Sequence, residues 1–139
     1  MSKWNYLRKC RRCLVNKRLF VLFFLCPWLL TACAFGYQAR GSLSDVPGEL
    51  RGKGYPGNSG GGRFALADSD GRLACDGQAE APTSSPNPGS CAGESGAGRL
   101  RCSDGRQIAF VWQGLSCRSF KGGGVDLQGN RLEFVVERR

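Results

Sequence analysis

The sequence predicts an all-β protein, either a small antiparallel sheet or a partly open barrel of about five or six short strands. Short runs of alternating apolar and polar residues are separated by Asp-Gly turns, which is the pattern of β-hairpins. No segment of residues 63–139 has the 3.6-residue period of a helix. Four cysteines between residues 75 and 117 suit a small domain stapled by two disulfides, which we expect to follow a flexible tether.

The N-terminal segment has the order of an export signal. Residues 1–18 contain seven lysines and arginines and no acidic residue, and Leu19 to Leu30 is an apolar run of 12 residues. A membrane-spanning helix needs about 20 apolar residues, and Pro27 interrupts this run. Two alternatives to a cleaved lipoprotein signal stay open for this segment: an uncleaved membrane anchor, and a signal for ordinary secretion without a lipid.

The end of this segment, Leu30-Thr31-Ala32-Cys33, resembles the lipobox of bacterial lipoproteins. The resemblance implies a signal peptide over residues 1–32, cleavage before Cys33, and lipidation of Cys33. Several acyl chains on one cysteine would anchor the chain stably to a membrane. Ala34 stands where an aspartate would favour inner-membrane retention in enterobacterial lipoproteins, so the resemblance implies the outer membrane, facing the periplasm.

Residues 33–62 are predicted to be a flexible tether behind the lipidated cysteine. The stretch is rich in Gly, Pro and Ser and has few large apolar groups. Such a composition buries too little surface to offset the entropy lost on ordering. A docked strand around Tyr37 or Leu50 is an alternative without further support.

Residues 63–139 are predicted to be the folded β domain. Alternating runs flank the turns Asp68–Gly71 and Ser103–Arg106, and a last run covers 131–137. The segment Asp76–Ala97 is expected to be a long loop pinned by Cys91. The predicted core consists of the apolar residues on one face of these runs: Phe64, Leu66, Leu73, Leu100, Ile108, Phe110, Trp112, Leu132, Phe134 and Val136.

The four cysteines of this domain are predicted to form two structural disulfides, because an exported protein meets an oxidising compartment. They are Cys75, Cys91, Cys102 and Cys117. None of their spacings is C-x₂-C, so neither a zinc site nor a redox dithiol is indicated. We favour Cys75–Cys91 with Cys102–Cys117. The alternative is Cys75–Cys102 across the core with Cys91–Cys117.

Several short motifs follow one another along the domain: Cys-Asp-Gly, then Gly-x-Leu-x-Cys-Ser-Asp-Gly-Arg, then a Trp and a Cys, and then Asp-x-x-Gly-Asn. In this order they resemble small uncharacterised lipoproteins of proteobacteria. The resemblance covers about residues 60–139 and implies no known activity.

The charge balance argues against nucleic acid as a partner. The whole chain carries a net charge of +9, but all 11 acidic residues follow Cys33, where 13 basic residues remain. The chain after the signal is therefore close to neutral, and the excess of positive charge belongs to the export signal.

Catalytic and metal-binding motifs are weak, and no cofactor is indicated. Gly57–Gly61 resembles a serine-nucleophile loop, but the chain has no histidine to serve as its base. Lys121–Asp126 approaches a calcium-binding repeat in a single copy, which turn chemistry explains. Trp112 is expected in the core. Four arginines are candidates for a binding surface: Arg99, Arg101, Arg106 and Arg118.

These observations predict a non-catalytic, lipid-anchored envelope protein of structural or binding type. Its partners would be the membrane, through Cys33, and an envelope protein or polymer. One alternative is a hydrolase of an envelope polymer that uses a pair of carboxylates. Its candidates would be Asp76, Glu80, Glu94 and Asp104. The other alternative is a secreted soluble binding module.

Overall fold

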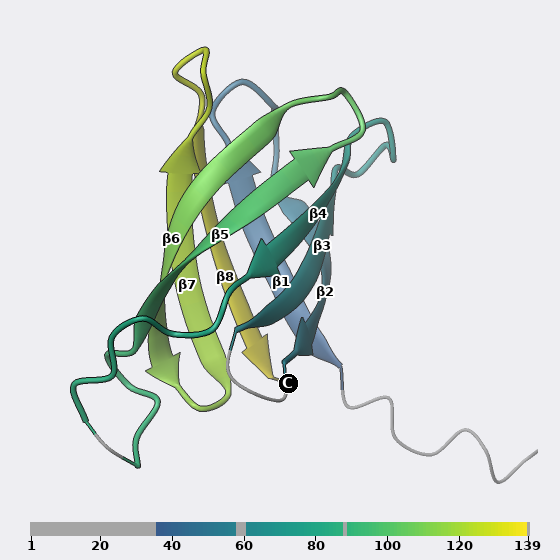
Figure 1. Ribbon diagram of the computed structural model, residues 1–139. Coiled ribbons are helices and arrows are strands. Elements are labelled where there is room, and N and C mark those ends of the chain that lie inside the picture. The colour runs from purple at the N-terminus through teal and green to yellow at the C-terminus, as the bar shows by residue number, and fades with distance from the viewer. Residues whose placement is uncertain (1–35, 58–60, 88, 139) are drawn as a thin grey trace, which may run out of the picture. The chain divides into compact units, whose positions relative to one another are not determined.

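The computed structural model describes residues 36–57, 61–87 and 89–138, which form a closed antiparallel β-barrel (Figure 1). Each strand pairs with the next along the chain, and the last strand pairs with the first. The strands are β1 (Tyr37–Leu43), β2 (Leu50–Pro56), β3 (Gly62–Ala67), β4 (Ala74–Ala79), β5 (Ser95–Cys102), β6 (Gln107–Ser116), β7 (Ser119–Val125) and β8 (Arg131–Arg138). The described residues include no helix long and apolar enough to span a membrane.

The predicted all-β antiparallel class with two disulfides is confirmed, but the strand count and the open sheet are wrong. Eight strands close the barrel. The tether prediction over 33–62 is also wrong where β1 and β2 lie, and β7 was not expected as a strand. In β1, β2 and β7, glycine occupies inward positions where a large apolar residue would normally produce the alternating pattern of a strand. The expected loop 76–97 is shorter, because β4 reaches Ala79 and β5 begins at Ser95.

Two predictions lie outside the described residues: the signal peptide over 1–32 and the lipidated Cys33. The part of the Gly57–Gly61 motif at 58–60 is likewise outside them.

The barrel interior is filled by side chains. All ten predicted core residues are buried, and Ala39, Leu43 and Leu50 join them from the segment expected to be a tether. Phenylalanine rings pack at the centre, with the Phe134 ring centroid 4.4 Å from that of Phe64 and 4.9 Å from that of Phe110. Eight-stranded barrels are narrow enough for side chains to fill them.

Inward-facing glycines make room for these rings. Gly77 is the register partner of Phe64, and Gly98 is the partner of Phe110. A Cβ atom at either glycine would collide with the partner's ring. Pairing an aromatic ring with glycine on the neighbouring strand keeps the curved sheet packed and leaves no void over the glycine.

The two ends of the barrel differ in their connections. One end, which we call the turn end (top in Figure 1), carries the β1–β2, β3–β4, β5–β6 and β7–β8 connections. In three of these turns a glycine with positive φ (Gly71, Gly105, Gly129) donates its N–H to the carbonyl three residues earlier. This backbone conformation suits glycine because it has no Cβ. The opposite end, the loop end, carries the start of β1 and the long 80–94 loop.

The disulfides join Cys75 to Cys102 and Cys91 to Cys117. The pairing favoured from the sequence is therefore wrong, and the alternative is observed. Cys75 and Cys102 are inward-facing register partners on β4 and β5, with Cα atoms 3.9 Å apart. Cys91 lies in the loop at the far end of β4, next to the β6–β7 turn that holds Cys117.

Candidate functional site

Because the core fills the inside of the barrel, the polar chemistry of the described residues lies on its outer surface and at its ends. Side chains alternate along each strand, so every second residue points outward. We divide this surface into two walls of four consecutive strands. The grooved wall is the outer face of β6, β7, β8 and β1, and the basic wall is the outer face of β2 to β5.

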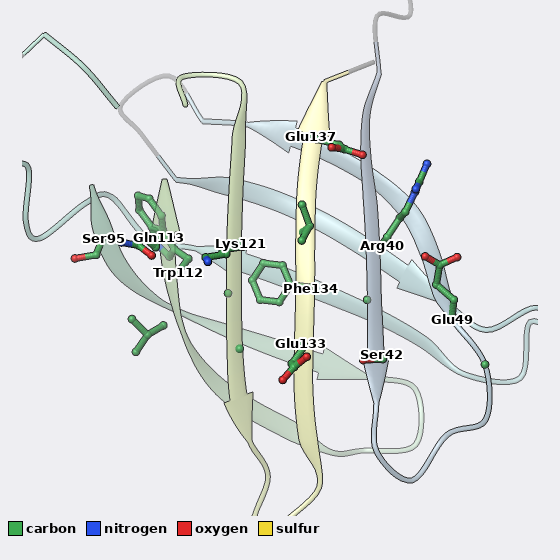
Figure 2. Close-up of a pocket in the computed structure, with 16 residues that line it drawn as sticks. Arg40, Ser42, Glu49, Ser95, Trp112, Gln113, Lys121, Glu133, Phe134 and Glu137 are labelled. Carbon is green, nitrogen blue, oxygen red and sulfur yellow. The ribbon is translucent and has the colours of Figure 1, made fainter. Parts of the chain in front are cut away.

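The grooved wall contains a shallow groove of about 1210 Å³ (Figure 2). Val111, Gly123, Glu133 and Ser42 lie across it as successive register partners on β6, β7, β8 and β1. Gly123 has no side chain, so the surface is hollowed between Val111 and Glu133. The next row forms one bank of the groove: Gln113, Lys121, Val135 and Arg40.

The groove combines exposed apolar groups with charges that lack partners. Val111 is 66% exposed and Val135 is 36% exposed. Within the described ranges, four of its charged residues form no ion pair: Arg40, Lys121, Glu133 and Glu137. An apolar surface bordered by unpaired charges of both signs is typical of an interaction surface.

The basic wall has a different composition. Its outward residues include five cations, Arg51, Lys53, Arg63, Arg99 and Arg101, against one carboxylate, Asp76. Arg63 binds Asp76 at 2.9 Å, and Arg51 binds Glu49 in the preceding loop at 2.7 Å. Among the residues that the structure describes, Lys53, Arg99 and Arg101 have no carboxylate partner.

At the turn end, Arg106 connects three turns. Its Nε donates to Asp104 Oδ2 at 2.7 Å, and its Nη1 donates to Asp45 in the β1–β2 loop at 2.9 Å. The hydrogen bond from Arg106 lowers the pKa of Asp45. Asp126 Oδ2 lies 3.9 Å from Arg106 Nη1, and the Asp126 side chain is only 2% exposed.

Asp126 has the structural role that turn chemistry predicts. Its carboxylate accepts the backbone N–H groups of Gln128 and Asn130, both at 2.8 Å, and the Asn130 side-chain amide. Burial raises the pKa of Asp126, but these hydrogen bonds outweigh it, so that the pKa falls below its usual value. No group of three or more potential metal ligands occurs in the described part of the chain.

Of the four carboxylates considered for hydrolysis, Glu94 and Asp104 lie far apart, whereas Glu80 follows β4 at the same end as Glu94. Glu94 directly precedes β5 and Asp104 follows it, so they lie at opposite ends of an eight-residue strand, about 26 Å long. A glycosidase pair is separated by about 5–9.5 Å. Asp76 is bound to Arg63, Asp104 to Arg106, and Glu94 accepts a hydrogen bond from Ser85 Oγ.

The arginine set is also divided. Arg99 and Arg101 share the basic wall, whereas Arg106 lies at the turn end and Arg118 in the β6–β7 turn. Trp112 is buried as predicted, and its Nε1 donates to the Glu80 carbonyl at 3.2 Å.

Comparison with protein-family models, with curated proteins and with solved structures finds no match to this chain. The sequence did not indicate Arg40, Arg51 and Lys53 as surface residues of a strand, because they lie in the segment expected to be a tether. These three residues alternate with Ala39, Gly41, Leu50 and Gly52. This alternation indicates two strands once glycine is accepted as an inward-facing residue.

Proposed function

We propose that this protein is a lipid-anchored, non-catalytic binding protein of the cell envelope. Cys33 carries the lipid at the outer membrane, facing the periplasm, and the grooved wall binds an envelope protein or polymer. The observation that carries this proposal is the groove itself. It combines exposed apolar groups with unpaired charges on a barrel whose interior is filled.

The groove suits an extended, charged segment. It runs across neighbouring strands, with Gly123 as a bare floor and Lys121 and Arg40 along one bank. Glu133 lies in the row beside Gly123. A chain lying there would bring acidic groups to the cations of the bank and a basic or hydroxyl group to Glu133.

Anchoring is tested with Cys33→Ser in the full-length chain. This variant should accumulate as unprocessed precursor and lose fatty-acid labelling, because the lipid and the cleavage both depend on the cysteine. Normal cleavage together with recovery of the variant in the membrane fraction would refute the lipid anchor.

Binding is tested with a photo-crosslinking amino acid at Val111, on the grooved wall, in cells that make the lipidated chain. The matched control position is Ala65, which is also exposed and outward but lies on β3 of the basic wall. We expect an adduct of defined mass from position 111 that Glu133→Lys removes. Identical adducts from both positions, or none from position 111, would refute the groove as the binding site.

The non-catalytic part of the proposal is supported by the ion pairs that hold Asp76 and Asp104, and by the length of β5 between Glu94 and Asp104. The purified chain should be inert on envelope polymers. A reproducible hydrolysis that is lost in Asp76→Asn, Glu94→Gln or Asp104→Asn would refute it and favour the carboxylate hydrolase.

A further inference from the structure

We infer that the basic wall lies against the anionic headgroups of the membrane that anchors the chain, so that the grooved wall faces away from the lipid. This inference rests on the proposed lipidation of Cys33. The partner of the basic wall is a lipid surface that carries phosphate groups.

The first step is the length of the connection between anchor and barrel. Because β1 begins at Tyr37, only three residues separate it from Cys33. Even fully extended, the chain from Cys33 to Tyr37 spans at most about 14 Å. A flexible tether of about 30 residues would instead have allowed an average separation of about 30 Å. The barrel is therefore held at the membrane surface by its loop end.

The second step is the distribution of charge around the barrel. The basic wall has five cations against one carboxylate, whereas the grooved wall has three cations, Arg40, Lys121 and Arg131, against Glu133 and Glu137. The turn end is acidic, with the basic residues Arg72 and Arg106 among six acidic ones: Asp45, Glu49, Asp68, Asp70, Asp104 and Asp126. An anionic surface attracts the basic wall and repels the turn end.

The third step is the range of this attraction. The Debye length at physiological ionic strength is about 8 Å, so a charge must stay close to the surface to act on it. The short connection from Cys33 to Tyr37 keeps the barrel within about two such lengths. A tumbling domain on a long tether would spend most of its time beyond that range.

The fourth step is the shape of the basic wall. Its central strands, β3 and β4, present the short outward side chains of Ala65, Ala67 and Ala74 beside those of Arg63, Asp76 and Gln78. Longer cationic side chains flank them on both sides, from β2 and from β5. Arginine and lysine side chains of this length can reach down to lipid phosphates. At the loop end of the same wall, Tyr55 is 60% exposed, and tyrosine is enriched at membrane–water interfaces.

Binding of the basic wall to a membrane can be tested without the lipid on Cys33, because the barrel has its core, its strand pairing and both disulfides within residues 36–138. The probe is the chain from residue 33 with Cys33→Ser, mixed with vesicles of phosphatidylcholine alone or with added phosphatidylglycerol. We expect partition only onto the anionic vesicles, and loss of partition at high salt.

The decisive variant carries Lys53→Gln, Arg99→Gln and Arg101→Gln, the three cations of the basic wall without carboxylate partners. Each cation near an anionic surface strengthens partition roughly fivefold, so the variant should bind about 100-fold more weakly. The matched control carries Arg40→Gln, Lys121→Gln and Arg131→Gln on the grooved wall. It removes the same net charge and should change partition by less than about fivefold, the effect of a single cation at the surface.

Several outcomes would overturn the inference. They are equal partition onto neutral and anionic vesicles, an equal loss in both triple variants, or displacement of the protein from vesicles by inorganic phosphate at matched ionic strength. The last result would indicate a site for free phosphate instead of a lipid surface.

A second measurement uses the lipidated chain with a fluorescent amino acid at Ala65 or at Val111. Quenchers attached to lipid headgroups should quench the probe at position 65 more strongly. Equal or reversed quenching would overturn the orientation, whereas failure of fatty-acid labelling at Cys33 would overturn the anchor. The two proposals can therefore fail separately.

Discussion

The two walls of the barrel are built alike on the inside and differently on the outside. Beneath the basic wall, Gly77 packs under the ring of Phe64, and beneath the grooved wall Gly122 packs under the ring of Phe134. On the outside, one wall presents cations around short alanines, and the other presents a glycine-floored groove with exposed valines. Figure 2 shows the labelled residues of the grooved wall on the strands in front, with other strands of the barrel behind them.

This difference separates folding from function. Inward residues on both walls must fit one narrow core, so they are restricted to the same pairs of rings and glycines. Outward residues are free of that restriction and can serve two different surfaces. Each of the following changes tests whether the walls are equivalent inside and distinct outside.

The largest effect is expected from the disulfides. Cys75–Cys102 joins β4 to β5 inside the barrel, beneath the basic wall, whereas Cys91–Cys117 joins the β4–β5 loop to the β6–β7 turn. Their sequence separations are 27 and 26 residues, so the chain-entropy contribution is about 3.5 kcal/mol for each. Replacing both cysteines of a pair by alanine should cost about this much, and more for the buried Cys75–Cys102. Urea unfolding measures it, and unchanged midpoints would contradict the stapled barrel.

A somewhat smaller loss is expected from Gly77→Val and Gly122→Val, one beneath each wall. The new Cβ of Gly122→Val would lie 2.6 Å from Phe134 Cζ, and that of Gly77→Val would collide with the Phe64 ring. Overpacking of this kind costs about 2–3 kcal/mol. The control is Ala109→Val, which is outward and exposed on β6. Destabilisation by only one of the two variants would show that the walls are not equivalent inside.

The two walls meet where β1 pairs with β2 and where β5 pairs with β6, and we call these two boundaries the seams. At the turn end, the Arg106–Asp45 ion pair connects the loop of one seam to the turn of the other. Arg106→Gln should destabilise the barrel by about 1 kcal/mol, because Asp45 and Asp104, whose side chains are 33% and 36% exposed, lose the guanidinium that they share. The control is Arg72→Gln, which removes an exposed pair with Asp70. An equal effect of both variants would show that the seam has no special role.

The Arg106–Asp45 ion pair predicts that the stability of the barrel depends on pH. The pKa of Asp45 is lower in the folded than in the unfolded chain, so the unfolded chain binds the proton first as the pH falls. The stabilisation is thus complete above about pH 4, near the unfolded pKa, and is lost as the pH falls below it. Urea midpoints of the wild type should decrease over this range more than those of Arg106→Gln. Parallel decreases would contradict the prediction.

The smallest effect on folding is expected from the unpaired surface cations. Arg99→Gln with Arg101→Gln on the basic wall, and Lys121→Gln with Arg40→Gln on the grooved wall, should each change stability by less than about 0.5 kcal/mol. These side chains are outward and have no ion-pair partner among the residues that the structure describes. Thermal unfolding of both double variants measures this, and a large loss in either would assign that wall a structural role.

The sequence predicted the strands whose inward residues are large. The alternation around Phe64, Phe110 and Phe134 identified the core, and the Asp-Gly pairs identified the turns. It did not predict β1, β2 or β7, where inward glycines make a strand resemble a linker. A glycine position is recognisable as buried only when the ring that covers it is known, and that ring lies on another strand.

The sequence by itself determined the β class, the ten core residues, the presence of four disulfide-forming cysteines and the lipobox-like motif at Cys33. Only the tertiary structure decided the closure of the barrel, the pairing of the cysteines and the composition of the two walls. Ser42 and Glu133 are distant in sequence, and strand register brings them together in one row with Val111 and Gly123. Register depends on pairing between strands, and therefore on the whole sheet.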